Sequence, residues 1–229
     1  MENLPFYISG GFIATTLLTV FFIYRASNCS TGVIVVAAAW LLLQGGLALT
    51  GFYQVSSGLP PRFSLLLVPP VLLIAGLFAL KRGRDFLDGF DSGRLTLLHV
   101  VRLPVELTLY ALYLYRYVPT MMTFEGGNLD ILSGLSAPFI FYFGYAKPIL
   151  SRKCLLAWNI FCLLLLVNIV GRAVLSAPFT FQRFGFGQPN VALFYFPFSW
   201  LPGFVVPVVL LAQLINIRKI IAGLIQGRK

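Results

Sequence analysis

Charged residues are scarce in this sequence, and acidic residues are the scarcest of them. Only 10% of the 229 residues are Asp, Glu, Lys or Arg, and 7 of these are acidic. Soluble globular domains carry about 25% charged residues, which help to cover their water-exposed surface. The composition therefore excludes an ordinary soluble domain.

Cysteine and histidine are also rare, which limits the chemistry that the chain can support. The sequence has 3 Cys and 1 His, with no CxxC or HxxxH pattern, so we expect no metal site and no cofactor. Cys154 and Cys162 lie about 12 Å apart along one helix, too far for a disulfide bond. We interpret all three cysteines as small buried hydrophobic residues.

Hydrophobic residues make up 59% of the chain, and its mean hydropathy is +0.88. A helix needs about 20 apolar residues to cross a bilayer. Seven segments of roughly this length can be identified: residues 5–24, 31–53, 63–80, 95–117, 129–146, 154–177 and 191–217. We therefore predict an all-α integral membrane protein, with residues 1–229 forming a single seven-transmembrane-helix bundle.

Most basic residues fall in alternate connections between these segments. The connections after the first, third and fifth segments, together with the C-terminal end, hold Arg25, Lys81, Arg82, Arg84, Arg94, Lys147, Arg152, Lys153, Arg218, Lys219, Arg228 and Lys229. The other connections hold Arg62, Arg116, Arg172 and Arg183. The positive-inside rule then places the N-terminus outside and the C-terminus in the cytosol of a cell (plasma or inner) membrane.

The net charge of +10 is thus explained by topology. A nucleic-acid-binding protein would need clustered basic residues on a soluble domain, and the sequence has no such domain. We expect the lipid bilayer and a small solute, ion or lipid ligand as partners, and no nucleic acid. The oligomeric state stays open.

Segment 95–117 carries the most ionisable side chains of the apolar segments. At about 100° per residue, one helix face collects His99, Arg102, Glu106, Tyr110 and Tyr113, and Tyr117 extends it. Ionisable groups at membrane depth usually face a partner or a water-filled cavity. We therefore predict that this face points into the bundle and binds a substrate.

Arg102 precedes Glu106 by four residues, so we predict that the two side chains pair along the helix. Two interpretations of the pair stay open. It either holds the bundle together as a structural ion pair, or it serves with His99 as a proton relay or a docking site for a polar solute.

Four further residues are candidates for the same substrate-binding site: Gln44, Asn168, Arg172 and Trp200. Gln44 stands beside a Gly-Gly pair, where it either faces a cavity or makes an interhelical hydrogen bond at a close crossing. Arg172 either extends its side chain to the interface or provides the countercharge for a carboxylate of the outer connection.

That outer connection, before the fifth segment, contains Glu125, Asn128 and Asp130 around a second Gly-Gly pair. Asn128 or Asp130 is expected to cap the fifth helix. A role in binding a ligand or an ion is the alternative interpretation.

Two of the segments share a proline pattern. Residues 61–69 and 189–197 both start and end with proline, near the outer entrances of the third and seventh segments. Proline-interrupted segments in corresponding positions are typical of transport sites. The pattern suggests a parallel repeat of three helices, one linker helix and three helices, and it predicts that the seventh segment is partly unwound.

Three functional hypotheses follow from these patterns. The first is binding or transport of a small solute or ion, with proton coupling through His99 and Glu106. The second is a membrane-embedded enzyme acting on a lipid-like substrate, with Glu106 or His99 as general base and Arg102 holding an anionic head group. The third is a seven-helix sensor or receptor.

The predicted topology can be tested by placing single cysteines at Ser57 and Asp88. A membrane-impermeant thiol reagent applied to sealed cells is expected to label the cysteine at position 57 only, because the basic connection that contains Asp88 should lie in the cytosol. Labelling of both positions from the outside would contradict the seven-segment topology.

Overall fold

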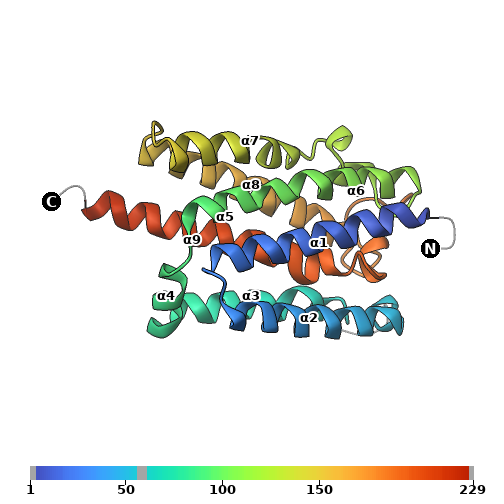
Figure 1. Ribbon diagram of the computed structural model, residues 1–229. Helices are drawn as coiled ribbons and strands as arrows, with labels where there is room; N and C mark the ends of the chain where they lie inside the picture. Colours follow the sequence, from blue (N-terminus) through green and yellow to red (C-terminus); the bar gives the residue numbers. More distant parts are fainter. Residues whose placement is uncertain (1–3, 56–60, 227–229) are drawn as a thin grey trace.

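The computed structural model describes residues 4–55 and 61–226, so the test position Ser57 lies outside the described part. The described residues form helices and no strand, which confirms the all-α prediction (Figure 1). The α-helices are α1 (Phe6–Ala26), α2 (Thr31–Leu49), α3 (Ser64–Ala79), α4 (Lys81–Asp88), α5 (Ser92–Leu98), α6 (Arg102–Leu114), α7 (Ile131–Phe141), α8 (Arg152–Leu175) and α9 (Val206–Gln226).

Five to six of the helical stretches are long and apolar enough to cross a membrane. The five are α1, α2, Ser92–Leu114, α8 and Leu201–Ile225. A sixth results if α3 and α4 count as one span, although they are bent by 94°. The helix over Ile131–Ala146 is apolar but only about 24 Å long, shorter than the roughly 30 Å hydrocarbon core. The structure thus supports a multi-pass membrane bundle but leaves the predicted count of seven unconfirmed.

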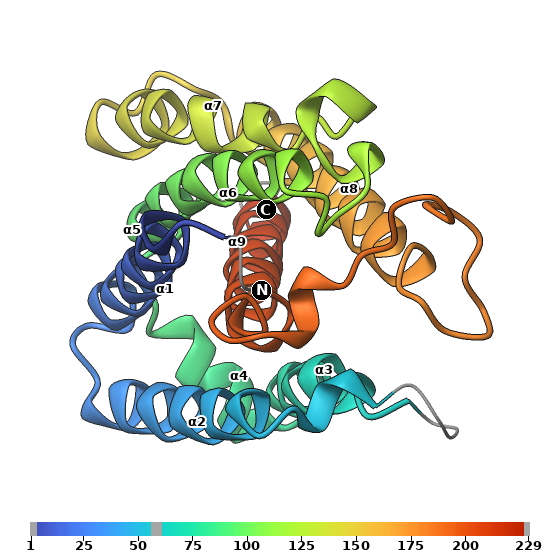
Figure 2. The ribbon, with the colours of Figure 1, turned by 90° about the vertical axis from the view of Figure 1, so that its right-hand side faces the viewer.

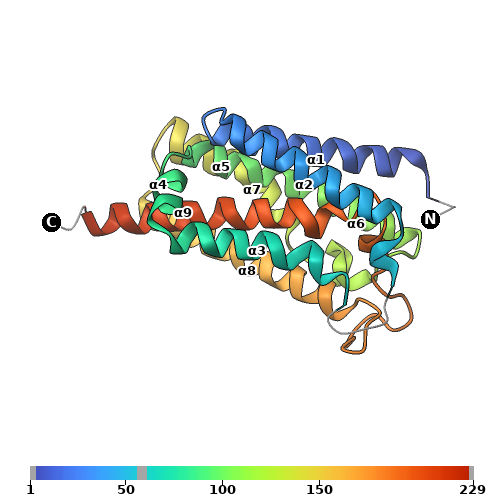
Figure 3. The ribbon, with the colours of Figure 1, turned by 90° about the horizontal axis from the view of Figure 1, so that it is seen from below.

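Basic side chains at one end of the bundle stabilise helix C-termini. This end, where Figures 1 and 3 show α4 and the C-terminus, is called the basic end below. Arg84 Nη1 donates to the carbonyl oxygens of Phe78 (3.0 Å) and Ala79 (2.7 Å), and Arg94 Nη1 donates to that of Arg25 (2.6 Å). Cations there complement the negative end of the helix dipole.

Helix α9 occupies the middle of the bundle and is seen end-on in Figure 2. It packs against α8, α5 and α3. Its polar side chains Gln213 and Asn216 are fully buried, as are the apolar Ala212 and Ile215. A polar group buried in this position must find partners inside the bundle.

The seventh segment departs from the predicted range. Residues 191–200 contain only the short 3₁₀ turn η6 (Ala192–Phe194), and the continuous helix starts with the π-helical turn η7 (Leu201–Val205). Pro197 and Pro202 explain why the helix starts later than predicted. Proline has no backbone N–H to donate, so it is tolerated in the first turn of a helix but costs a hydrogen bond in its interior. Helix α3, which contains Pro69 and Pro70, packs against η7. The two proline-interrupted segments therefore meet, while the parallel repeat remains a hypothesis.

A glycine sets the close approach of α7 to α6. A Cβ added to Gly134 would lie 2.7 Å from the backbone nitrogen of Leu103, which is closer than real Cβ atoms come to such an atom. Small residues allow helix backbones in membranes to approach in this way. The contact places the start of α7 against the start of α6.

We predict that Gly134→Ala destabilises the fold by about 1–3 kcal/mol, the usual cost of overpacking a well-packed contact. Gly10→Ala is the matched control, because an added Cβ there meets nothing within 4 Å. Alanine also has the higher helix propensity, so the control should be neutral or slightly stabilising. Equal free energies of unfolding for the two variants would show that the α6–α7 contact is not tight.

Candidate functional site

The ionisable face of segment 95–117 points into the bundle, as predicted. His99, Arg102 and Glu106 are exposed by only 0%, 2% and 1%. Helix α5 ends at Leu98 and is followed by the 3₁₀ turn η2 (His99–Val101), and α6 begins at Arg102. Pro104 is tolerated there because it falls in the first turn of α6, where backbone N–H groups have no helical partner. The position of Pro104 thus fits the break between α5 and α6, and the buried polar side chains lie on either side of this break.

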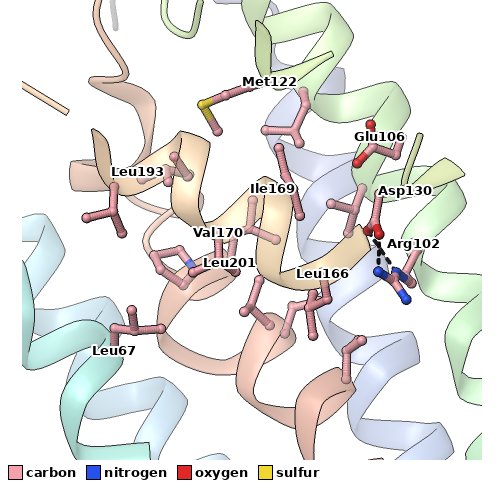
Figure 4. Close-up of a pocket in the computed structure, with 18 of the residues that line it drawn as sticks. Leu67, Arg102, Glu106, Met122, Asp130, Leu166, Ile169, Val170, Leu193 and Leu201 are labelled. Atoms are coloured by element: carbon pink, nitrogen blue, oxygen red, sulfur yellow. Dashed lines mark hydrogen bonds and ion pairs between the residues drawn. The ribbon is translucent and has the colours of Figure 1, made fainter. Parts of the chain in front are cut away.

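Arg102 pairs with Asp130. The pair that we predicted, between Arg102 and Glu106, does not form. Its Nε donates to Oδ2 of Asp130 at 2.7 Å, its Nη2 donates to Oδ1, and Nη2 also reaches the carbonyl oxygen of Cys162 at 3.1 Å (Figure 4). Two parallel N–H···O bonds are the strongest arrangement that arginine makes with a carboxylate. The predicted pair fails because Asp130, 28 residues away in sequence, is brought against α6 by the close α6–α7 contact.

Asp130 occupies the N-cap position of α7, as expected, but its side chain makes no cap hydrogen bond. The carboxylate is committed to Arg102 instead. Asn128 does not cap α7 either. Its Oδ1 accepts a hydrogen bond from the backbone N–H of Asp130, which precedes the first helical residue, at 3.2 Å.

Glu106 contacts an amide rather than a cation. Nδ2 of Asn128 lies 2.7 and 2.8 Å from the two carboxylate oxygens and 3.1 Å from the carbonyl oxygen of Met122. Among residues 4–55 and 61–226, no basic side chain forms an ion pair with Glu106. The carboxylate is therefore buried and hydrogen-bonded but forms no ion pair.

A cavity of about 60 Å³ adjoins these groups. Arg102, Glu106 and Asp130 supply the ionisable part of its wall (Figure 4). The remaining wall is mainly hydrocarbon from α8, η7 and α9, with Met122 near the outer connection. The arrangement concentrates charge at one side of a small apolar chamber, the usual form of a small-ligand site.

Arg172 and Asn168 lie outside the cavity wall and hold the outer connection in place. Nη1 of Arg172 donates to the carbonyl oxygens of Met121 (2.9 Å) and Gly126 (2.8 Å), and its Nε donates to Asn168 Oδ1 at 3.2 Å. The structure thus does not pair Arg172 with Glu125 or Asp130. By fixing the connection that carries Asn128, Arg172 positions the partner of Glu106.

The outer half of the polar face also lies away from the cavity. The hydroxyl of Tyr110 donates to Glu125 Oε1 at 3.0 Å, and its ring packs against those of Phe124 and Tyr113. Glu125 itself is exposed. These groups connect α6 to the outer connection.

Gln44 and Trp200 meet neighbouring helices elsewhere in the bundle. Gln44 accepts a hydrogen bond from Tyr53 and donates to the carbonyl oxygen of Leu65 at 3.4 Å. Nε1 of Trp200 donates to the carbonyl oxygen of Leu41 at 2.9 Å, and its ring lies against Gly45. Both side chains make interhelical contacts of the kind that holds membrane bundles together.

Sequence reasoning missed a second buried polar layer between His99 and the basic end. Nε2 of Gln213 donates to the carbonyl oxygen of Asn159 at 2.9 Å, and Nδ2 of Asn216 donates to Thr96 Oγ1 at 3.1 Å. The ring of His99 packs edge-on against Trp158. The spacing of Gln213 and Asn216, three residues apart in an apolar helix, is a signal that could have revealed this layer.

The fold and the site define a helical bundle whose helices are apolar enough for a multi-pass membrane protein, with ionisable groups buried beside an internal cavity. No family model, curated protein sequence or solved structure matches the chain.

Proposed function

We propose that the protein binds a small, singly charged cation, a proton included, at Glu106 and moves it across the membrane. The observation that supports this most strongly is the buried Glu106 carboxylate, which faces the cavity without a basic partner.

The charges of the site do not cancel. Arg102 and Asp130 form a pair, so their charges offset each other, while an ionised Glu106 leaves one negative charge at the cavity. A charge buried without a partner is very unfavourable in low dielectric. A bound cation or a proton on the carboxylate removes this cost, and the site is therefore complementary to positive charge.

The size of the cavity limits the ligand. The cavity of about 60 Å³ is far smaller than the roughly 300–1,000 Å³ of sites for drug-sized ligands, so the proposed ligand is a proton, a small ion or a simple amine and not a sugar or a lipid. The largely hydrocarbon wall offers few other polar contacts, so the carboxylate would dominate recognition.

Irregular backbone beside the cavity supports movement rather than static binding. Residues 191–199 contain only a short 3₁₀ turn before the last helix, and Leu193 of this stretch lines the cavity beside Pro202 of the π-helical turn η7. Broken helices at membrane depth are typical of transport sites, where they allow one part of the bundle to shift against another.

The alternative of an enzyme acting on a lipid receives no such support. The larger apolar cleft of the bundle, which has room for a lipid chain, has no ionisable side chain in its wall. Its residues Val208 and Leu211 of α9 lie on the helix face opposite Val206 and Val209 of the Glu106 cavity. Helix α9 would thus separate an acid–base group at Glu106 from a lipid chain bound in the cleft.

The proposal is tested with purified protein in liposomes that contain a pH-sensitive dye. Gradients of Na⁺, K⁺ or methylammonium are imposed, and both cation uptake and internal pH are recorded. Wild-type protein is expected to carry at least one of these cations, or protons, and Glu106→Gln is expected to abolish the flux because the neutral amide removes the negative charge.

Asp85→Asn is the matched control, since it makes the same carboxylate-to-amide change at an exposed position on α4. It should leave the flux unchanged. Folded wild-type protein without flux of any tested cation or proton, or equal flux in wild type and Glu106→Gln, would contradict the proposed function.

A further inference from the structure

A second and larger cavity lies on the other side of α9. It is an open cleft of about 650 Å³ between α2 and α3, within the size range of small-molecule sites. Trp40 and Leu43 of α2, and Pro69 and Leu73 of α3, belong to its two walls, and Gly203 and Phe204 belong to its floor. The lining is almost entirely apolar.

The length of the cleft corresponds to one leaflet of a bilayer. Its lining on α2 extends from Gly32 to Leu43, which is about 16 Å of helix. The hydrocarbon core of a bilayer is about 30 Å thick, so the cleft covers roughly half of it. The half in question adjoins the basic end, because α4 contributes Phe86, and Phe90 follows it, at the end of the cleft.

The basic end of the cleft also offers positive charge. Helix α4 turns by 94° away from α3, and Arg82 precedes Phe86 by one helical turn, on the same face. The side chain of Arg82 is exposed and makes no hydrogen bond or ion pair with any residue in the described ranges. The hydroxyl-bearing Ser30 lines the same end. A guanidinium and a hydroxyl group are suited to a phosphate.

We infer that this cleft binds one acyl chain of an anionic phospholipid from the leaflet at the basic end, with the phosphate of the head group at Arg82. Leu43 and Leu73 line the cleft and are also exposed on the surface of α2 and α3, so the cleft opens toward hydrocarbon and an acyl chain enters without crossing water. This inference does not depend on the proposed cation site.

The inference is tested by lipid retention. Protein stripped of lipid in detergent is incubated with equal amounts of phosphatidylglycerol and phosphatidylethanolamine, and bound lipid is measured by native mass spectrometry. Wild-type protein is expected to retain phosphatidylglycerol in preference. Ala39→Trp should reduce the retained lipid several-fold by filling the cleft, because Ala39 lines it. Ala38→Trp is the matched control, since Ala38 is exposed but does not line the cleft.

The head-group contact is tested separately with Arg82→Gln, which should remove the preference for phosphatidylglycerol. Lys81→Gln is the matched control, because Lys81 lies on a different face of α4 and its loss should preserve the preference. If Ala39→Trp does not fold, Leu73→Trp and Leu72→Trp provide the same comparison from the other wall, because only Leu73 lines the cleft.

Three results would overturn the inference: equal retention by both members of each tryptophan pair, no preference of the wild type for phosphatidylglycerol, or a dimer that the cleft-filling variant dissociates. The last result would assign the cleft to a second copy of the chain.

Discussion

The ion pair between Arg102 and Asp130 is the interaction on which the organisation of the polar site depends. Both side chains are almost fully buried, and neither could be accommodated there alone, since an unpaired charge in low dielectric carries a large cost. The pair connects the first turn of α6 to the residue that precedes α7. The close contact at Gly134 brings these two helix starts together, and Arg172 fixes the connection between them from α8.

This pair also determines the state of Glu106. Because Arg102 is committed to Asp130, the second carboxylate has only the amide of Asn128 as a side-chain partner and faces the cavity without a basic partner. Helix α9 separates that cavity from the apolar cleft between α2 and α3, with one face toward each. The bundle thus keeps the cavity beside Glu106 apart from the apolar cleft, and the two proposed ligands differ accordingly.

Much of the fold could be predicted from local properties of the sequence. Seven apolar stretches were expected and all seven regions contain helix, because hydrophobicity and length are local signals. The inward orientation of His99, Arg102 and Glu106 was also predictable, since helical spacing puts them on one face and the cost of exposing them to lipid is high.

The identity of the ionic partners could not be predicted in this way. The i, i+4 rule favoured Glu106 as the partner of Arg102, while the actual partner lies 28 residues along the chain and was expected to cap a helix. For Gln44, beside its Gly-Gly pair, the sequence left open a cavity or an interhelical hydrogen bond, and the structure shows the hydrogen bond. Trp200, also a candidate for the site, contacts α2 instead. The partial unwinding of the seventh segment was predicted from its prolines and is confirmed, whereas the residue at which the last helix starts was not predicted by the apolar pattern.

The pairing of Arg102 with Asp130, which leaves Glu106 without a basic partner, is tested most directly by a double-mutant cycle on the free energy of unfolding. Arg102→Met and Asp130→Leu alone should each cost about 3–5 kcal/mol, because each leaves the other charge buried without a partner. The double variant should regain most of this loss. A parallel cycle of Arg102→Met with Glu106→Leu should show weaker coupling. Additive losses in the first cycle, or stronger coupling of Arg102 to Glu106 than to Asp130, would contradict this account.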